Sequence, residues 1–339
     1  MNQIRKNNSV ARVLIIGLLL VLNGSLIAQK NFMEIAQMKD KKWDNFRKGS
    51  DYYISQLMLI DGLIDVGLLK EENTPNPKDI GVLTFQLWDE STWKSSKAGG
   101  WVYYEKNFIS EDGSNMISNR IMEEILPKIR AKYTSAGFNL MEPDEFITNE
   151  EQKKIYFNGP SRVELSGILK FFSNGLLNRL QGNSNGGTGS VSADGYAFYP
   201  VTAKTVSMDF KSPSNIGLIT EELGLDASLL IAVRVSIEKG GRSLVFRGFE
   251  MAVVTTIDDE KDKEYSGRIG AKLMNMYRDG LTMSASYFQM DPIMLADLER
   301  KTGNVEKWYL DGVDLVAERM TDDVIFGMKK FINRDKSRK

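Results

Sequence analysis

The chain has 339 residues, of which 42% are hydrophobic and 26% are charged, a composition typical of a globular protein. Its formal net charge of -1 gives no long-range attraction to nucleic acid or to an acidic membrane surface. The chain contains neither histidine nor cysteine. These absences exclude serine–histidine–aspartate triads, cysteine nucleophiles, and zinc or haem sites with nitrogen or sulfur ligands. Catalysis by paired carboxylates or a lysine base stays open, but we favour a non-catalytic protein without a cofactor.

The first 28 residues are typical of an export signal. A cationic stretch precedes an apolar run at 13–22, and a short segment with small residues ends at Ala28. The run is too short to span a bilayer, which needs about 20 residues. We therefore expect cleavage after Ala28, no membrane-spanning segment in the mature chain, and a periplasmic or secreted location. An uncleaved membrane anchor is the alternative, because the apolar run extends through Ile27 if the chain is not cut.

Residues 29–79 are predicted to form an N-terminal helical region. Apolar side chains spaced by three and four residues share one face of a helix. These side chains are Tyr53, Leu57, Ile60, Ile64 and Leu68. Pro75 and Pro77 end the region, because proline interrupts a helix.

Residues 80–333 are predicted to form an α/β domain, and a basic tail follows at 334–339. We expect a mixed sheet with helices packed on it. Two insertions are expected, at 89–110 and at 161–213, and the second contains a glycine-rich linker at 182–190.

The domain begins with a strand–helix–strand–helix pattern. The buried-looking strand 80–87 precedes a helix with an N-cap at Ser114 and a stop at Gly137. A short strand at 138–142 follows, and Asp144 is expected to cap the next helix. This order predicts parallel strand pairing with a right-handed crossover.

The C-terminal half predicts a long hairpin and a closing helix. Strand-like runs at 229–237 and 242–257 flank Gly240-Gly241, a dipeptide typical of tight hairpin turns. Residues 281–288 predict a further strand, and 313–332 a helix with one apolar side. That side is formed by Val316, Met320, Val324, Met328 and Ile332.

Three short stretches give a resemblance to a known family. They are Gly81-Val82-Leu83-Thr84-Phe85, the segment GFNLMEPD at 137–144, and the segment ITEELGLDASLLIAV at 219–233. In this order they resemble the periplasmic α/β domain shared by the curli secretion channel protein, the penicillin-binding-protein activator lipoproteins and the amino-terminal domain of the Tol-Pal translocation protein. The resemblance implies a non-catalytic envelope component that docks on other proteins.

The chain also departs from that family. It lacks the cysteine that carries the lipid in the lipoprotein members. The stretch after the first strand is longer than usual, and residues 161–213 form a large insertion before the third sheet strand.

An aromatic cluster at the first insertion is the candidate partner-binding surface. Its members are Trp88, Trp93, Trp101, Tyr103 and Tyr104. Aromatic side chains among lysines suit contact with a protein or a glycan, whereas packing over the sheet as a small local core is the structural alternative. The favoured function is an exported envelope protein that binds another protein, as yet unidentified, in envelope assembly or secretion, with self-association left open. The alternative is a secreted carbohydrate-active or ligand-binding protein that uses the same aromatics.

No metal site is expected from the sequence. The acidic run Asp258-Asp259-Glu260, with Asp262 and Glu264, lacks the ligand spacing and central glycine of a calcium-binding loop, and lysines interrupt it. A solvated turn is the favoured interpretation of this run.

We predict that EDTA leaves the melting temperature of the purified protein unchanged to within about one degree, because the chain has no recognised ligand set for a stabilising ion. Differential scanning fluorimetry with and without the chelator tests this. A clear fall in melting temperature would contradict the prediction and would direct attention to the acidic run.

Overall fold

The computed structural model describes residues 31–46, 75–91, 94–98, 101–105, 109, 111–158, 191–199, 215–238, 241–256, 280–299 and 304–333. Its strands are β1 Asp79–Asp89, β2 Lys94–Ala98, β3 Trp101–Glu105, β4 Asn139–Met141, β5 Val191–Ser192, β6 Ala227–Ile237, β7 Ser243–Thr255, β8 Leu281–Leu298 and β9 Val305–Trp308. Its helices are α2 Phe32–Ala36, α3 Asp40–Phe46, α5 Glu111–Ala136, α6 Pro143–Phe146, α7 Glu150–Asn158, α11 Ile216–Glu222 and α14 Val313–Ile332.

A seven-stranded mixed sheet organises the fold, in the order β4-β1-β6-β7-β8-β9 with β5 beside β1. Strand β1 runs parallel to β4 on one edge and to β6 on the other, whereas β6, β7, β8 and β9 are antiparallel. The predicted α/β class, the early parallel pair and the long hairpin are therefore confirmed. At the hairpin turn Gly241 has a positive φ of 66°, which glycine adopts without strain.

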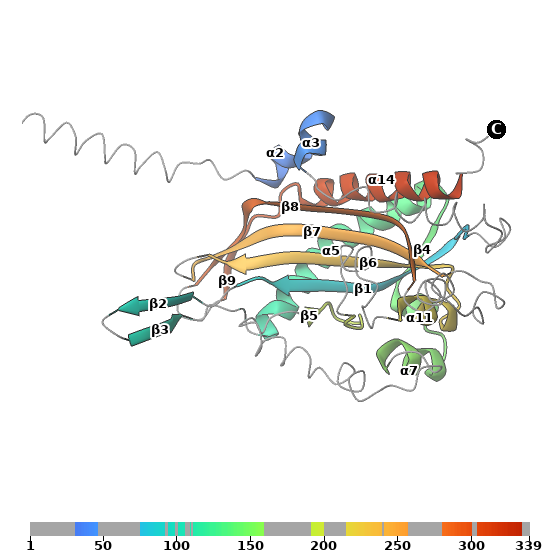
Figure 1. The fold of residues 1–339 in the computed structure, drawn as a ribbon, viewed down its shortest axis with the longest axis horizontal. Coiled ribbons are helices and arrows are strands. Elements are labelled where there is room, and N and C mark those ends of the chain that lie inside the picture. The colour runs from blue at the N-terminus through green and yellow to red at the C-terminus, as the bar shows by residue number, and fades with distance from the viewer. Residues whose placement is uncertain are drawn as a thin grey trace, which may run out of the picture.

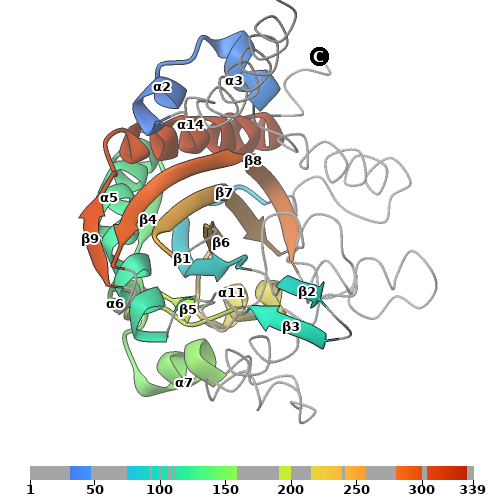
Figure 2. The same ribbon diagram turned by 90° about the vertical axis from the view of Figure 1, so that its left-hand side faces the viewer.

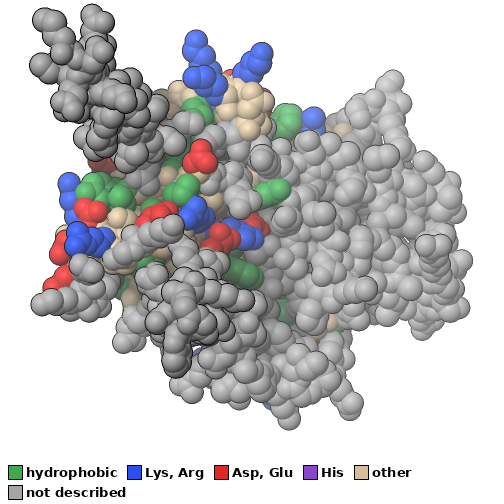
Figure 3. Space-filling view, turned by 60° about the vertical axis from the view of Figure 1, so that its left-hand side comes forward, with side chains coloured by type: hydrophobic (Ala, Val, Ile, Leu, Met, Phe, Trp, Pro, Cys, Tyr) green, Lys and Arg blue, Asp and Glu red, His purple; other side chains and the backbone are tan. Residues whose placement is uncertain are grey.

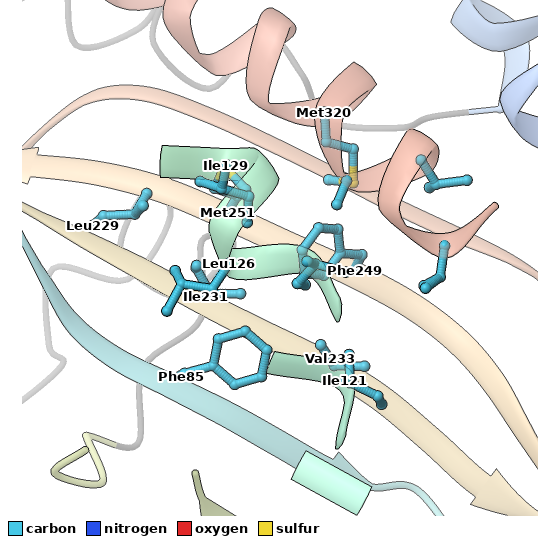
Figure 4. Packing of buried hydrophobic residues seen from close by; sticks show 14 of the residues in the cluster. Phe85, Ile121, Leu126, Ile129, Leu229, Ile231, Val233, Phe249, Met251 and Met320 are labelled. Atoms are coloured by element: carbon cyan, nitrogen blue, oxygen red, sulfur yellow. The ribbon is translucent and has the colours of Figure 1, made fainter. Parts of the chain in front are cut away.

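Two apolar cores lie on opposite faces of the sheet. The larger core packs side chains of β1, β6 and β7 against α5 and α14, and Figure 4 shows Phe85, Ile231 and Phe249 turned toward these helices. The smaller core lies beneath α6, α7 and α11 on the other face. Figures 1 and 2 show α14 above the curved strands, and α11 and α7 on the opposite side. The predicted apolar side of α14 is confirmed, with Ile332 partly buried.

A register shift in β1 changes the phase of the alternation that sends adjacent side chains into the two cores. It falls between Val82 and Thr84 in the pairing with β6. Val82 joins the larger core, whereas Leu83 joins the smaller core together with Tyr156. The Tyr156 hydroxyl donates to the Leu83 carbonyl at 2.9 Å and accepts from the Ala197 amide at 3.0 Å. One buried hydroxyl thus satisfies two backbone groups at the irregularity.

Two predicted helix starts are wrong. Helix α5 begins at Glu111, so Ser114 lies buried inside the helix and does not precede it. The N-cap of α6 is Glu142 and not Asp144, because Glu142 and Glu145 form a reciprocal capping box. The predicted stop of α5 at Gly137 is confirmed by its positive φ of 90°.

Several predictions fall on residues outside the described ranges. These are the export signal, the apolar stripe at 53–68, most of the insertion 161–213, the acidic run at 258–264 and the basic tail. Of the expected N-terminal helical region, α2 and α3 are described. Among the residues that the structure describes, no helix combines the length and the hydropathy needed to cross a bilayer.

Tyr156→Phe is expected to lower the free energy of unfolding by about 1–3 kcal/mol, because two buried backbone groups lose their partner. Tyr133→Phe is the matched control, since its hydroxyl is buried without a hydrogen-bond partner among the described residues. Removing that hydroxyl should leave stability unchanged or raise it. Urea unfolding followed by circular dichroism measures both variants, and equal losses would contradict the assigned role of Tyr156.

Candidate functional site

The sheet changes its winding direction between β1 and β6. The connection from β1 to β4 carries α5 on one face, and the connection from β4 to β6 carries α6, α7 and α11 on the other. In open α/β sheets, ligands bind outside the carboxyl ends of the strands at such a reversal. The residues at this place are Trp88, Asp89, Glu90, Arg234 and Glu250. We call them the switch-point cluster.

Arg234 is the centre of the switch-point cluster. Its Nε donates to Oε1 of Glu250 at 2.6 Å, and its Nη1 donates to Glu90. Its guanidinium carbon lies 5.8 Å from the centroid of the Trp88 ring, the directly paired residue on β1. Glu250 is 1% exposed, whereas the Arg234 side chain is 24% exposed. The cluster therefore holds one cation between two carboxylates at the edge of the interior.

The ionisation of Arg234 follows from this geometry. Burial lowers the pKa of its guanidinium, but the nearby Glu250 and Glu90 carboxylates raise the pKa by more, so the net direction is upward. Arg234 stays cationic at every pH at which the protein is folded. Arg234 is consequently a fixed structural charge and not a proton carrier.

Asp89 fastens both ends of the expected insertion 89–110 to the sheet. Its carboxylate accepts from the backbone amide of Ser91 at 2.8 Å and from that of Ile109 at 3.0 Å. The Ser91 hydroxyl in turn accepts from the Ile237 amide at 2.8 Å. Burial raises the pKa of Asp89 despite these hydrogen bonds. The folded state therefore binds this proton more tightly than the unfolded chain, and protonation of Asp89 favours folding. This favourable effect is complete below the unfolded value of 3.8 and is lost as the pH rises through the folded pKa.

A chain of polar contacts extends from the cluster along one face of β1. The Trp88 indole donates to Oε1 of Gln86 at 2.7 Å, and Nε2 of Gln86 donates to the Thr84 hydroxyl at 3.1 Å. Thr84 donates to the Ala197 carbonyl at 2.8 Å, and Gln86 also donates to the Tyr199 carbonyl. Sequence reasoning missed Thr84 and Gln86, whereas it named Trp88. Their signal was the presence of two alternating polar side chains inside an otherwise apolar run.

The structure describes the backbone position of four of the five predicted aromatic residues. Trp88 is half-buried beside Arg234, and Trp93 lies outside the described residues. The other three lie on β3, where Trp101 pairs with Ala98, Tyr103 with Ser96 and Tyr104 with Ser95. The backbone of this hairpin therefore brings three of the predicted aromatic residues onto one strand.

The hairpin β2–β3 lies beyond the carboxyl end of β1, at the opposite end of the molecule from α11 and α7 (Figure 1). Figure 2 looks onto this end, with β2 and β3 near the viewer. On the described part of the surface in Figure 3, lysine and arginine side chains lie next to aspartate and glutamate side chains. This part of the surface therefore presents charges of both signs and no field of a single sign.

Within the ranges that the structure describes, no group of three acidic side chains is arranged to hold a metal ion. An open hollow of about 370 Å³ lies between α6 and α7, on the face of the smaller core. It is lined in part by Pro143, Ile147, Lys153 and Phe157, and none of these residues belongs to the switch-point cluster. Comparison of the chain with protein-family models, with curated proteins and with solved structures finds no match.

Glu250→Ala is expected to lower the free energy of unfolding by about 2–3 kcal/mol, because it leaves Arg234 under-neutralised in a largely buried place. The loss stays below that of a fully buried pair, because solvent screens a side chain that is partly exposed. Replacing both residues, Arg234→Met with Glu250→Leu, should recover stability to within about 1 kcal/mol of the wild type. A double-mutant cycle from urea unfolding measures these values, and equal losses for single and double variants would contradict the pair's assignment.

Proposed function

We propose that the protein is an exported component of the cell envelope that binds another protein and does not catalyse a reaction. The contact surface is formed by the hairpin β2–β3 together with the switch-point cluster at its base. The observation that carries the proposal is that the polar groups of the cluster already bind other groups of the same chain.

The cluster supports binding over catalysis because its polar atoms already have partners. Arg234 is held by two carboxylates, Asp89 by two backbone amides, and the Trp88 indole by Gln86. An acid, base or nucleophile must instead turn its reactive atom toward a substrate. An interlocked cluster serves better as a rigid base that fixes the point from which the hairpin extends.

The stretches that carry the family resemblance meet at the other end of the sheet. Asp226 accepts from the backbone amides of Lys78 at 2.7 Å and Asp79 at 2.9 Å. A Cβ at Gly81 would lie 2.5 Å from Leu225, so this glycine permits the two segments to touch. Such contacts join β1, β4 and β6 at their amino ends. The arrangement supports an α/β domain of the resembled kind, with a structural joint at one end and a contact surface at the other.

The test changes the hairpin without disturbing its base. One variant replaces Trp101, Tyr103 and Tyr104 by serine, and a second replaces residues 93–106 by a short Gly-Ser linker. Both keep Asp89, Ser91 and Ile109, which are fastened to the sheet. Because large aromatic side chains dominate the energy of protein interfaces, we expect at least about a tenfold loss of specific cross-linking to envelope proteins. The melting temperature should stay near that of the wild type.

Phe157→Ser is the matched control, because it removes an aromatic side chain that is 44% exposed and lies on α7. It should leave cross-linking unchanged. A collapse of the thermal transition in the hairpin variants would show that the aromatics form a local core, and unchanged cross-linking would place the contact surface elsewhere. Hairpin-dependent binding on a glycan array would favour the carbohydrate-binding alternative.

A further inference from the structure

The first described segment of the chain is fastened along α14. We call residues 31–46, which comprise α2 and α3, the strap. Three of its large apolar side chains are buried in the larger core, with exposed fractions of 1% for Phe32, 0% for Ile35 and 2% for Trp43. The Phe32 ring meets Phe246 of β7 edge to face, with centroids 5.1 Å apart. The strap is therefore part of the core.

Arg319 of α14 holds the strap from below. Its Nη1 donates to the carbonyls of Ala36 at 3.2 Å and Met38 at 2.6 Å, and its Nη2 donates to Oδ1 of Asp40 at 2.8 Å. The guanidinium carbon lies 4.9 Å from the centroid of the Trp43 ring. One side chain thus binds both helices of the strap and the turn between them.

The start of the strap lies against the start of α14. Asn31 caps α2 by accepting from the Glu34 amide at 2.8 Å. At Gly312, a Cβ would lie 2.7 Å from the backbone nitrogen of Met33 and 2.9 Å from its Cα. The close approach requires glycine at this position. Asn31, the first residue of the strap, is therefore already fixed as the cap of a docked helix.

We propose that docking of the strap controls whether the export leader can be removed. The inference rests on the proposed export, in which cleavage follows Ala28. Residues 29 and 30 alone then separate the scissile bond from Asn31. A protease needs extended, accessible chain on both sides of the bond it cuts, and the docked strap is helical and buried.

Cleavage of the folded chain therefore requires the strap to leave α14 first. When such opening is fast, the rate of proteolysis follows the population of the open state. Chains cut before the strap docks are released, whereas chains that fold first keep their apolar leader as a membrane anchor. The rate of strap docking relative to the rate of cleavage thus decides between the released form and the form anchored by its leader.

The experiment compares two substrates of purified signal peptidase in detergent. One is the folded full-length chain, and the other is a peptide of residues 1–46, which carries the same leader and the same bond but has no α14 to dock on. Mass spectrometry follows the product that starts at Gln29. We expect the folded chain to be cut at least about tenfold more slowly, because the open state is the minor one.

Two variants away from the bond should accelerate cleavage of the folded chain. Arg319→Ala removes the contacts to the strap, and Gly312→Ala forces its backbone away. Each should raise the cleavage rate about tenfold, because the loss of a charge-assisted contact or of an unstrained close approach increases the population of the undocked strap. Arg120→Ala is the control for arginine loss, since Arg120 pairs with Glu123 and Glu124 on α5. Gly137→Ala controls for left-handed strain, because nothing lies within 4 Å of its Cβ position.

The outcomes separate the inference from the proposed export. Equal rates for the folded chain and the peptide would overturn the inference and leave export standing. Failure to cut either substrate after Ala28 would overturn the leader and the inference together. Acceleration by Gly137→Ala as large as that by Gly312→Ala would also overturn the inference, because general destabilisation would then explain the effect.

Discussion

Strand β1 is paired on both edges and covered on both faces, and the rest of the structure depends on this burial. Its residues from Ile80 through Leu87 are buried without interruption. A strand in this position must supply apolar contacts to two cores and find a partner for every polar group it carries. The alternation of side chains along the strand, whose phase changes beside Leu83, meets the first demand, and the contacts of Thr84 and Gln86 meet the second.

Those polar contacts give the two ends of β1 different roles. At the amino end, Asp226 and Leu225 fasten the strand to the turn that leads into β6. At the carboxyl end, the sheet reverses its winding, and the charge pair of Arg234 and Glu250 closes the interior. A substitution at the amino end of β1 should therefore change the stability of the fold. The loop that follows the carboxyl end can instead change in sequence while the sheet keeps its form.

The elements that could be predicted are those whose signal is local. Helix α14 has both predicted ends, because its apolar residues recur at helical spacing and Gly312 precedes it. The hairpin of β6 and β7 was equally visible from its two apolar runs. The start of α5 was placed too late because Ser114 looks like a cap, yet neighbouring chain buries it inside the helix. Edge strand β9 and the two-residue β5 are too short to give a periodic pattern.

The contacts that define the candidate site could not be predicted, because their partners are far apart in the sequence. Glu90 and Arg234 of the candidate site are 144 positions apart, and the same holds for the strap, where Arg319 and Asp40 are 279 positions apart. Periodicity places each of these residues on a strand or a helix but does not say which elements become neighbours. Sheet order decides that, and it places β6 beside β1.

Helix α14, which lies late in the sequence, packs against both the sheet and the strap, which comes early in the sequence. Its buried side closes the larger core through Met320 and Val324, and its Arg319 holds the strap. The same helix contacts β8, a strand on which Ser284 and Ser286 pair with Val253 and Met251 of the larger core. These serine hydroxyls are buried without a hydrogen-bond partner among the described residues, which costs stability. Their strand partners Val253 and Met251 belong to the core that α14 covers, so short side chains at these two positions add little bulk between the sheet and the helix that holds the strap.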